Sequence, residues 1–517
     1  MKYVEHPLIK KETLESRLYQ EAILGKAVKD NLLCVLPTGL GKTPIAIVLS
    51  VFRLEKCPDS KVLILAPTKP LIEQHFESFK KTIEMPENDF TIVTGMVKPS
   101  DRKEYYEQSK IIFATPQTIK NDLESGRIEL SDFSLVVFDE AHHSVGDYAY
   151  PYIAKVYLEN ARNPRILGLT ASPGGTKEKI NEIMKNLGIE NVEIRTEEDF
   201  DVEPWMKKKE VEWVHVELPQ TFSNIRESLR KAYEKRLNNL RKIGFSKPVR
   251  VVTKRDLLDL QKQLISSSSG GYRKFWGVSL VSQAIKIEHA LSLIETQGIG
   301  SLEKYFRKIR SEKAKSSMSL AKDSGIKKAM LLTIELNEKG FRHPKISKLC
   351  TIVSEQLRQK SDSKIIIFAN YRDMVKEIVK VLSSVENAKP VEFMGQREGL
   401  TQKEQKKRIE DFKSGEYNIL VTTSVGEEGI DIPEMGLAVF YEPVPSEIRS
   451  IQRRGRVGRT KMGRIIILIA KRTRDEAYYW TAHKKEKLMK KTLYELKGDV
   501  PEKKRGQLKL GDFQDLR

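Results

Sequence analysis

The sequence has few of the features of a secreted or membrane-embedded protein. Its 517 residues contain three cysteines, Cys34, Cys57 and Cys350, which are far apart and form no CxxC pair. This spacing argues against a disulfide framework or a cysteine zinc site and predicts reduced thiols. No apolar run approaches the roughly 20 residues of a membrane span. The charged N-terminus, MKYVEHPLIKKETLE, lacks the apolar core of a signal peptide. We therefore expect a cytoplasmic protein with no membrane partner.

Acidic residues are too few to balance the basic ones, and the excess is unevenly distributed. Lys and Arg number 91 against 71 Asp and Glu, a net charge of +20. Residues 205–340 alone hold 28 basic and 14 acidic side chains, a net charge of +14. Positive charge gathered in one segment is expected of a surface that binds a polyanion. A solvated, lysine-rich surface is the alternative that charge alone leaves open.

The pattern of apolar runs predicts two α/β domains with a helical segment between them. Between about residues 30 and 200, β-branched runs such as KVLILA and LVVFDE alternate with helix-length amphipathic segments. That alternation is typical of a parallel sheet with crossover helices. It returns at 364–470 with KIIIFA and RIIILIA. The middle segment instead carries apolar residues at helical spacing.

Four segments follow from this pattern. We predict an α/β domain at 1–204 and a basic helical insertion at 205–345. A second α/β domain is predicted at 346–497, and a flexible tail rich in polar residues at 498–517.

The loop PTGLGKT (37–43) follows the first apolar run and precedes a helix-like segment. A strand, a glycine-bearing loop and a helix N-terminus direct backbone N–H groups at phosphates. Lys42 adds charge near the β- and γ-phosphates of ATP, and the Thr43 hydroxyl is a ligand for Mg²⁺. Leu36 stands where the strict phosphate-loop pattern has its first glycine, so a chance glycine-rich turn is the alternative for this loop alone.

The run LVVFDEAHH (135–143) ends in two acids after a buried strand, about 100 residues beyond the loop. Doubly wound sheets place ligands at such strand ends. Asp139 is predicted to hold Mg²⁺, and Glu140 to position and polarise the attacking water. For the adjacent His142 and His143 we expect a structural or coupling role rather than metal binding.

These motifs and their order resemble the superfamily 2 helicases. Tyr19-Gln20, PTGLGKT, APTKPL, TG, ATPQT, DEAH and TAS occur in the first half of the chain, and FANYRD, VTTSVGEEGIDIP and QRRGRVGR in the second. The resemblance covers most of 15–200 and 350–470 and implies two RecA-like domains. It also removes the objection raised by Leu36, because this superfamily tolerates other residues there.

The resemblance implies roles for individual residues. The ATP-contacting residues would be Gln20 (at the adenine edge), Pro37, Thr38, Gly39, Gly41, Lys42, Thr43, Gly429, Asp431 and Gln452. The nucleic-acid backbone contacts would be Thr68, Thr94, Gly95, Thr115 and Thr422. Thr170 and Ser172 would couple the two sites. Arg456 and Arg459 would be arginine fingers that complete catalysis with Lys42 and Glu140 when the two domains close.

Within the superfamily, the DEAH variant, QRRGRVGR and the basic insertion are similar to the archaeal Hef and eukaryotic FANCM/Mph1 branch. This implies an ATP- and Mg²⁺-dependent motor on forked or junction DNA, nucleoid-associated in a prokaryote. No ERKxxxD nuclease signature is present, so we expect no DNA cleavage by this chain. An RNA-directed motor like RIG-I or Dicer is the main alternative, and a non-motor binding scaffold is a second.

Two further segments carry predicted contacts. Arg273 and Lys274 precede Phe275 and Trp276 in a basic, aromatic cluster that would contact or wedge a DNA junction, with core packing as the alternative. In the tail, Gln507, Leu510 and Phe513 resemble the peptide that docks on the PCNA sliding clamp. Gln514 stands where that peptide usually has a second aromatic residue.

Overall fold

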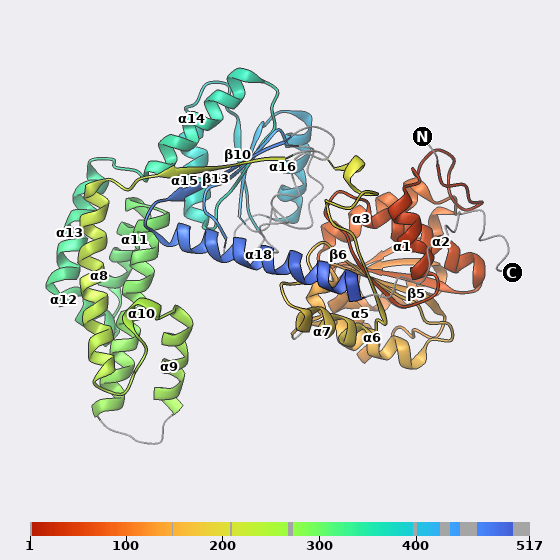
Figure 1. Ribbon diagram of the computed structural model, residues 1–517, viewed down its shortest axis with the longest axis horizontal. Helices are drawn as coiled ribbons and strands as arrows, with labels where there is room; N and C mark the ends of the chain where they lie inside the picture. The colour runs from red at the N-terminus through yellow and green to blue at the C-terminus, as the bar shows by residue number, and fades with distance from the viewer. Residues whose placement is uncertain are drawn as a thin grey trace.

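The structure is a computed structural model that describes residues 3–146, 148–206, 209–266, 272–395, 401–423, 435–444 and 463–499. These residues form two parallel β-sheets covered by helices and a separate helical bundle (Figure 1). We call the part built on the first sheet domain 1, the helices α8 to α13 the bundle, and the part built on the second sheet domain 2. The predicted fold class, two α/β domains with a helical insertion, is confirmed.

Domain 1 is built on a seven-stranded parallel sheet in the order β3-β4-β2-β5-β6-β1-β7. Its strands are β1 (Leu32–Val35), β2 (Lys61–Leu65), β3 (Phe90–Val93), β4 (Ile111–Ala114), β5 (Phe133–Asp139), β6 (Ile166–Thr170) and β7 (Asn191–Ile194). Hydrophobic clusters lie on both faces of this sheet, which is why its central strands are continuous apolar runs. All the strands are parallel, so their carboxyl ends meet at one edge.

Helices cross between the strands of domain 1, as parallel pairing requires. They are α1 (Leu18–Ala27), α2 (Lys42–Lys56), α3 (Lys69–Thr82), α4 (Pro99–Gln108), α5 (Pro116–Glu124), α6 (Ala149–Asn160) and α7 (Lys177–Leu187). Helices α2, α3 and α5 each begin directly after the loop at a strand end. The helix N-termini, with their unpaired N–H groups, therefore line the same edge of the sheet.

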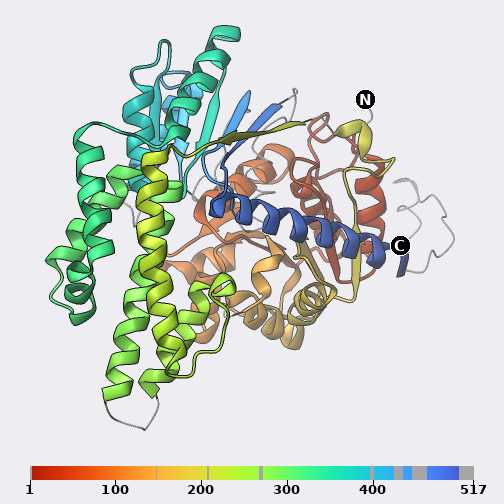
Figure 2. The ribbon, with the colours of Figure 1, turned by 60° about the vertical axis from the view of Figure 1, so that its left-hand side comes forward.

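The bundle comprises α8 (Gln220–Arg241), α9 (Lys254–Ser266), α10 (Tyr272–Thr296), α11 (Ile299–Ser311), α12 (Lys315–Lys322) and α13 (Ser324–Glu338). Apolar side chains of α8, α10, α11 and α13 form its core. Asp323 caps α13 by accepting hydrogen bonds from Gly325 N and Ile326 N, and it pairs with the buried Arg236 of α8 at 2.8 Å. The bundle projects away from domain 1 (Figures 1 and 2).

Domain 2 has a six-stranded parallel sheet in the order β10-β11-β9-β12-β13-β8. Its strands are β8 (Lys209–Val216), β9 (Ile365–Phe368), β10 (Pro390–Phe393), β11 (Ile419–Thr422), β12 (Leu437–Phe440) and β13 (Gly463–Ala470). Helices α14 (Pro344–Gln359), α15 (Arg372–Leu382) and α16 (Gln402–Ser414) belong to this domain. Apolar clusters cover both faces of the sheet.

One part of the expected helical insertion is not helical. Residues 209–216 form β8, which pairs with β13 along its whole length, from Lys209 with Gly463 to Val216 with Ala470. The helical part therefore begins at Gln220 and not at residue 205. β8 is an edge strand of this sheet, and its partner lies some 250 residues further along the chain. The outer limits of the four predicted segments stay predictions.

The long helix α18 (Arg474–Asp499) connects all three parts. It leaves the end of β13, passes the bundle and reaches domain 1 (Figures 1 and 2). Met489, Leu493 and Leu496 near its C-terminus are buried in the hydrophobic cluster on one face of the domain 1 sheet. Among the described residues, no helix is both long and apolar enough to span a membrane.

Candidate nucleotide and nucleic-acid sites

The PTGLGKT loop joins β1 to α2 at the carboxyl edge of the first sheet. Gly39 and Gly41 have φ of +87° and +80°, the left-handed region that glycine adopts without strain. A Cβ added at Gly41 would lie 2.5 Å from Gln20 Nε2, so the end of the Gln20 side chain would have to move, and the positive φ would be strained for any other residue. Lys42 Nζ donates to Leu36 O at 3.2 Å, which folds the lysine back over the loop.

Two side chains of helix α1 form hydrogen bonds with backbone carbonyl groups of this loop. Tyr19 Oη donates to Leu40 O at 2.7 Å, and Gln20 Nε2 lies 3.2 Å from both Leu40 O and Gly41 O. Both side chains are buried. The structure thus gives Gln20 a contact with the phosphate loop in addition to the adenine contact that the resemblance implies, which stays a prediction.

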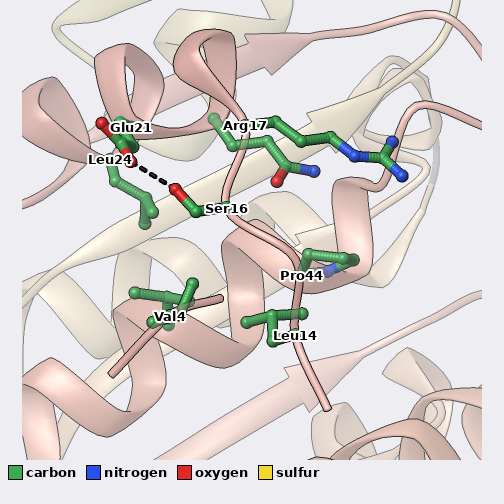
Figure 3. Close-up of a pocket in the computed structure, with 9 residues that line it drawn as sticks. Val4, Leu14, Ser16, Arg17, Glu21, Leu24 and Pro44 are labelled. Atoms are coloured by element: carbon green, nitrogen blue, oxygen red, sulfur yellow. Dashed lines mark hydrogen bonds between the residues drawn. The ribbon is translucent and has the colours of Figure 1, made fainter. Parts of the chain in front are cut away.

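A pocket lies beside Gln20 and the start of α2 (Figure 3). It is lined by Val4, Leu14, Ser16, Arg17, Gln20, Glu21, Leu24, Pro44 and Val48. Its lining is largely apolar, and Arg17 and Gln20 are among the polar side chains that line it. The Arg17 guanidinium lies 4.3 Å from the ring centroid of Trp205, so it is held in place by a cation–π contact. The cavity measures only about 10 Å³, about the space of one water molecule, so in this state it does not admit a nucleobase.

Asp139 ends the fully buried strand β5 and is only 6% exposed. His75 of α3, also buried, places Nε2 at 2.8 Å from Asp139 Oδ2. Burial raises the pKa of this carboxyl, but His75 and Lys42 outweigh it and hold the pKa below its usual value. The His75 Nδ1 atom is buried and has no hydrogen-bond partner in the part of the chain that the structure describes. Sequence reasoning missed His75 because nothing in the motif order marks a histidine 64 residues before the aspartate.

Glu140 follows in the left-handed conformation, with φ of +48°, which turns its side chain away from the strand. Its Oε2 lies 3.3 Å from His142 Nδ1, and the same nitrogen lies 3.2 Å from Thr170 Oγ1. Thr170 Oγ1 also accepts a hydrogen bond from Ser172 N, and Thr170 O accepts one from Leu36 N. His142 therefore links the DEAH and TAS segments, and Thr170 links both to the end of β1.

The predicted strand-contacting residues of domain 1 lie on the other half of the same edge. Thr68, Thr94 and Thr115 follow β2, β3 and β4, which are neighbours in the sheet. Thr68 and Thr115 are the N-cap residues of α3 and α5, and Gly95 is exposed beside Thr94. Among the described residues, Thr68 Oγ1 has no hydrogen-bond partner. One edge of the sheet thus carries nucleotide residues on β1, β5 and β6 and a row of hydroxyl groups on β2, β3 and β4.

Domain 2 contributes one described candidate for strand contact, Thr422. Thr422 ends β11 next to β9, which is followed by FANYRD. Thr422 is fully buried, and its hydroxyl donates to Thr423 O, so it contributes to the loop conformation in this state. Asn370 N donates to Glu442 Oε2 at 2.6 Å, which ties two neighbouring strand ends together. Gly429, Asp431, Gln452, Arg456 and Arg459 lie outside the described residues.

Of the two aromatic residues at the start of α10, one is exposed and the other is packed in the bundle. Phe275 is 74% exposed, whereas Trp276 packs against the second hydrophobic cluster of the bundle. Lys274 is partly exposed on the same helix. The side chain of Arg273 lies outside the described residues. The exposed aromatic ring beside a lysine suits contact with a nucleic acid, and that role stays a prediction.

The donor set at the domain 1 edge fits ATP and Mg²⁺. The Asp139 carboxylate and the Thr43 hydroxyl supply oxygen atoms, which Mg²⁺ prefers. The positive φ of Gly39 and Gly41 gives the loop the tight turn that a phosphate-binding loop requires. These residues come from α2, from the loop between β1 and α2, and from β5, which meet at one edge of the sheet, and their roles stay predictions.

Comparison with known proteins agrees with this geometry. Residues 12–175 match the family model of the type III restriction enzyme res subunit, and residues 344–461 match the helicase conserved C-terminal domain. The solved helicase domain of Hef from Pyrococcus furiosus is 46% identical, with a TM-score of 0.72. The alignment covers 92% of this chain and all of that one. The chain belongs to the superfamily 2 helicases, in the Hef/FANCM branch. Members of this family are ATP-driven motors, so the use of a nucleotide follows.

Named helicases of this family include relatives from archaea and fungi. A Methanocaldococcus jannaschii protein named "Putative ATP-dependent RNA helicase MJ1505" is 44% identical over 95% of this chain and 62% of its own length. The ATP-dependent DNA helicase fml1 of Schizosaccharomyces pombe is 33% identical over 89% of this chain and 57% of its own length. Residues 221–340 match a model of the helical bundle of an ATP-dependent RNA helicase. This helicase chain spans less than two thirds of these named relatives.

Proposed function

We propose that this helicase couples ATP hydrolysis to movement along DNA and acts on branched substrates such as forks and Holliday-type junctions. The observation that carries the proposal is the division of one sheet edge between nucleotide residues and a row of hydroxyl groups. His75 of α3, the helix that begins after Thr68, contacts Asp139 and so joins the two halves. The similarity to the Pyrococcus furiosus Hef helicase domain and to named DNA helicases supports DNA as the substrate.

The proposed chemistry follows from the geometry of the nucleotide site. Bound ATP with Mg²⁺ supplies the phosphoryl group that is transferred to water. Lys42, released from Leu36 O, neutralises phosphate charge, and Thr43 and Asp139 would hold the metal. Glu140 orients the attacking water, and His142 fixes the carboxylate of Glu140 relative to Thr170. We assign Arg456 and Arg459 to the γ-phosphate in the closed state.

The proposed contacts with the nucleic-acid strand do not depend on its base sequence. Hydroxyl and backbone groups at Thr68, Thr94, Gly95 and Thr115 suit phosphate contacts, which position a strand irrespective of its bases. Thr422 holds the matching loop of domain 2. Closure of the two domains changes the distance between the hydroxyl row of domain 1 and the Thr422 loop of domain 2. Each cycle of ATP hydrolysis therefore shifts one strand contact relative to the other. The basic bundle would also bind a duplex arm, because its lysines and arginines neutralise phosphates and release their counterions.

A second candidate function is action on RNA. It is favoured by one relative named as an RNA helicase and by the bundle model with a similar description. The described site carries no group that identifies a 2′-hydroxyl, so the residues themselves suit either nucleic acid. The proposed PCNA contact through Gln507, Leu510 and Phe513 lies outside the described residues and stays a prediction.

The proposal is tested by ATPase activation. Turnover is measured with fork DNA, linear duplex DNA, single-stranded DNA and duplex RNA, each titrated to saturation at one salt concentration. We expect fork DNA to activate most and RNA least. Stronger activation by duplex RNA would assign the chain to the RNA motors. Equal activation by forks and linear duplexes would reject branch specificity.

A further inference from the structure

The middle of α18 exposes an aromatic and basic stripe that none of the assigned sites uses. Trp480, Lys484, Lys487 and Lys491 are all exposed and recur at positions i, i+4, i+7 and i+11. Residues at these spacings share one face of a helix. The opposite face carries Met489, Leu493 and Leu496, which are buried against domain 1. The stripe therefore points away from the protein core.

Trp480 sits in a platform of rings and not in an apolar core. It is 56% exposed, and its ring centroid lies 5.0 Å from that of Tyr479 and 6.2 Å from that of His483. Tyr479 also contacts Trp213 of β8, which is 42% exposed. The side chains behind it hold the Trp480 ring, yet more than half of it faces solvent. A large, fixed and exposed aromatic surface marks a binding site more often than a packing defect.

The lysines next to this platform favour an anion. From 484 to 491 the chain has five lysines, Lys484, Lys485, Lys487, Lys490 and Lys491, and a single acid, Glu486. Within the described part of the chain, Lys491 pairs only with Glu495 of the same helix, at 3.6 Å. A contact of that kind between exposed side chains is weak, so it competes little with a bound anion. Charge complementarity therefore selects a polyanion over an apolar or basic protein partner.

We propose that this stripe binds an unpaired nucleic-acid strand, with one base stacked on Trp480 and phosphates on Lys484, Lys487 and Lys491. Stacking on a side chain requires a base that is not already stacked in a duplex, which is why the occupant is a single strand. The stripe extends over about 16 Å of helix, the axial length of about five nucleotides of one strand. This inference rests on the proposed action on nucleic acid.

The position of the stripe on α18 indicates which strand it would bind. α18 runs from the end of β13 in domain 2 to the TAS segment of domain 1, where Thr492 Oγ1 donates to Gly175 O at 3.3 Å. A strand displaced by the motor would be held on the helix that connects both domains. The displaced strand is thereby kept away from the strand that contacts the hydroxyl row of domain 1 and the Thr422 loop of domain 2.

The test measures binding of a fluorescent oligothymidine and of a blunt duplex by anisotropy over a series of salt concentrations. Trp480→Ala should weaken oligothymidine binding at least about 5-fold, the lower range for loss of one base stack, and Trp480→Phe should retain most of it. Lys484→Ala/Lys487→Ala should reduce the salt slope by about 1.4. The matched control, Lys56→Ala/Lys155→Ala, removes two exposed lysines from domain 1 and should bind like the parent.

Three results overturn the inference. If the parent binds oligothymidine and both α18 variants match its affinity and salt slope, the stripe is not a binding site, and the proposed function stands. If the variants lose duplex and oligothymidine binding equally, the stripe does not select an unpaired strand. If the parent binds neither DNA nor RNA, the inference and the proposed function fail together.

Discussion

The hydroxyl of Ser172 donates to the sulfur of Met489 at 3.2 Å, although 317 residues separate the two. Ser172 belongs to the TAS segment at the end of β6, and Met489 belongs to the helix that leaves domain 2. A segment expected to couple the ATP site to the strand track is therefore in direct contact with a structural link to the other domain. Movement of domain 2 has a physical path to Thr170 and the ATP site through α18.

The docking of α18 on domain 1 is the first feature to test. Leu493 is 5% exposed, whereas Leu488 on the same helix is 47% exposed. Leu493→Ala should weaken docking by about 2 kcal/mol or more, which corresponds to about 30-fold faster amide exchange in the last turns of α18. Leu488→Ala removes the same atoms from a solvated position and should leave exchange unchanged. Hydrogen–deuterium exchange compares the two, and equal exchange in both variants would mean that the helix is not held there.

The catalytic assignment predicts separable defects. Lys42→Ala should abolish ATP turnover, and Glu140→Gln should block hydrolysis while ATP still binds. Arg456→Ala or Arg459→Ala should reduce turnover at least about 100-fold, because arginine fingers contribute about 10³ to 10⁵. Turnover and nucleotide binding are measured for each variant. Near-parental hydrolysis by the Lys42 or Glu140 variant would disprove the site.

His75 should act through Asp139 and not on the nucleotide itself. Loss of a group that orients a metal ligand typically costs about 10- to 100-fold in metal affinity. His75→Ala should raise the Mg²⁺ concentration for half-maximal turnover by about that factor, with nucleotide binding in the absence of Mg²⁺ unchanged. His75→Gln, which keeps a donor, should restore part of the loss. The exposed Glu77 of the same helix provides the control, as Glu77→Ala. An unaltered Mg²⁺ response in His75→Ala would show that the contact is incidental.

A pH effect on stability should arise at the joint between the bundle and domain 2. His343 is buried there, with Nε2 at 3.0 Å from Glu295 O and Nδ1 accepting from Lys345 N. Burial lowers the pKa of His343 from 6.5 to about 3. The unfolded chain therefore binds a proton below about pH 6.5 that the folded chain does not, so stability falls as the pH falls.

At pH 5 this loss amounts to about 2 kcal/mol relative to pH 7. His343→Asn keeps an acceptor at the start of α14 and removes the titrating group. Urea unfolding at pH 7 and pH 5 should show a pH-dependent loss of stability that is smaller by about that amount in the variant. The same loss in parent and variant would place the acid sensitivity elsewhere.

The bundle should contribute salt-dependent DNA binding. Lys231, Lys235 and Arg255 have side-chain exposures of 75%, 69% and 91%. Replacing all three with Gln should reduce the salt slope of duplex binding by up to about 0.9 for each phosphate that is no longer neutralised. The Lys56→Ala/Lys155→Ala variant is again the control. Removal of 205–340 as a block would not test this point, because it deletes β8 from the sheet of domain 2.

Sequence reasoning predicted the parts of this fold that depend on local pattern. The strands around Lys42 and Asp139 are continuous apolar runs that end in chemically distinct residues, and both features are visible without a structure. β8 was missed because its pairing partner, β13, is encoded far away in the sequence. The contacts of His75 with Asp139 and of Met489 with Ser172 could not be predicted, since they depend on helix placement between distant segments.

The exchange of β8 and α18 between the two domains has a consequence for synthesis on the ribosome. Domain 1 is translated before domain 2, but the hydrophobic cluster on one face of its sheet is completed by Met489, Leu493 and Leu496, which follow every strand of domain 2. β8 likewise cannot pair until β13 has been made. Domain 1 can therefore complete this cluster only after the strands of domain 2 have been synthesised.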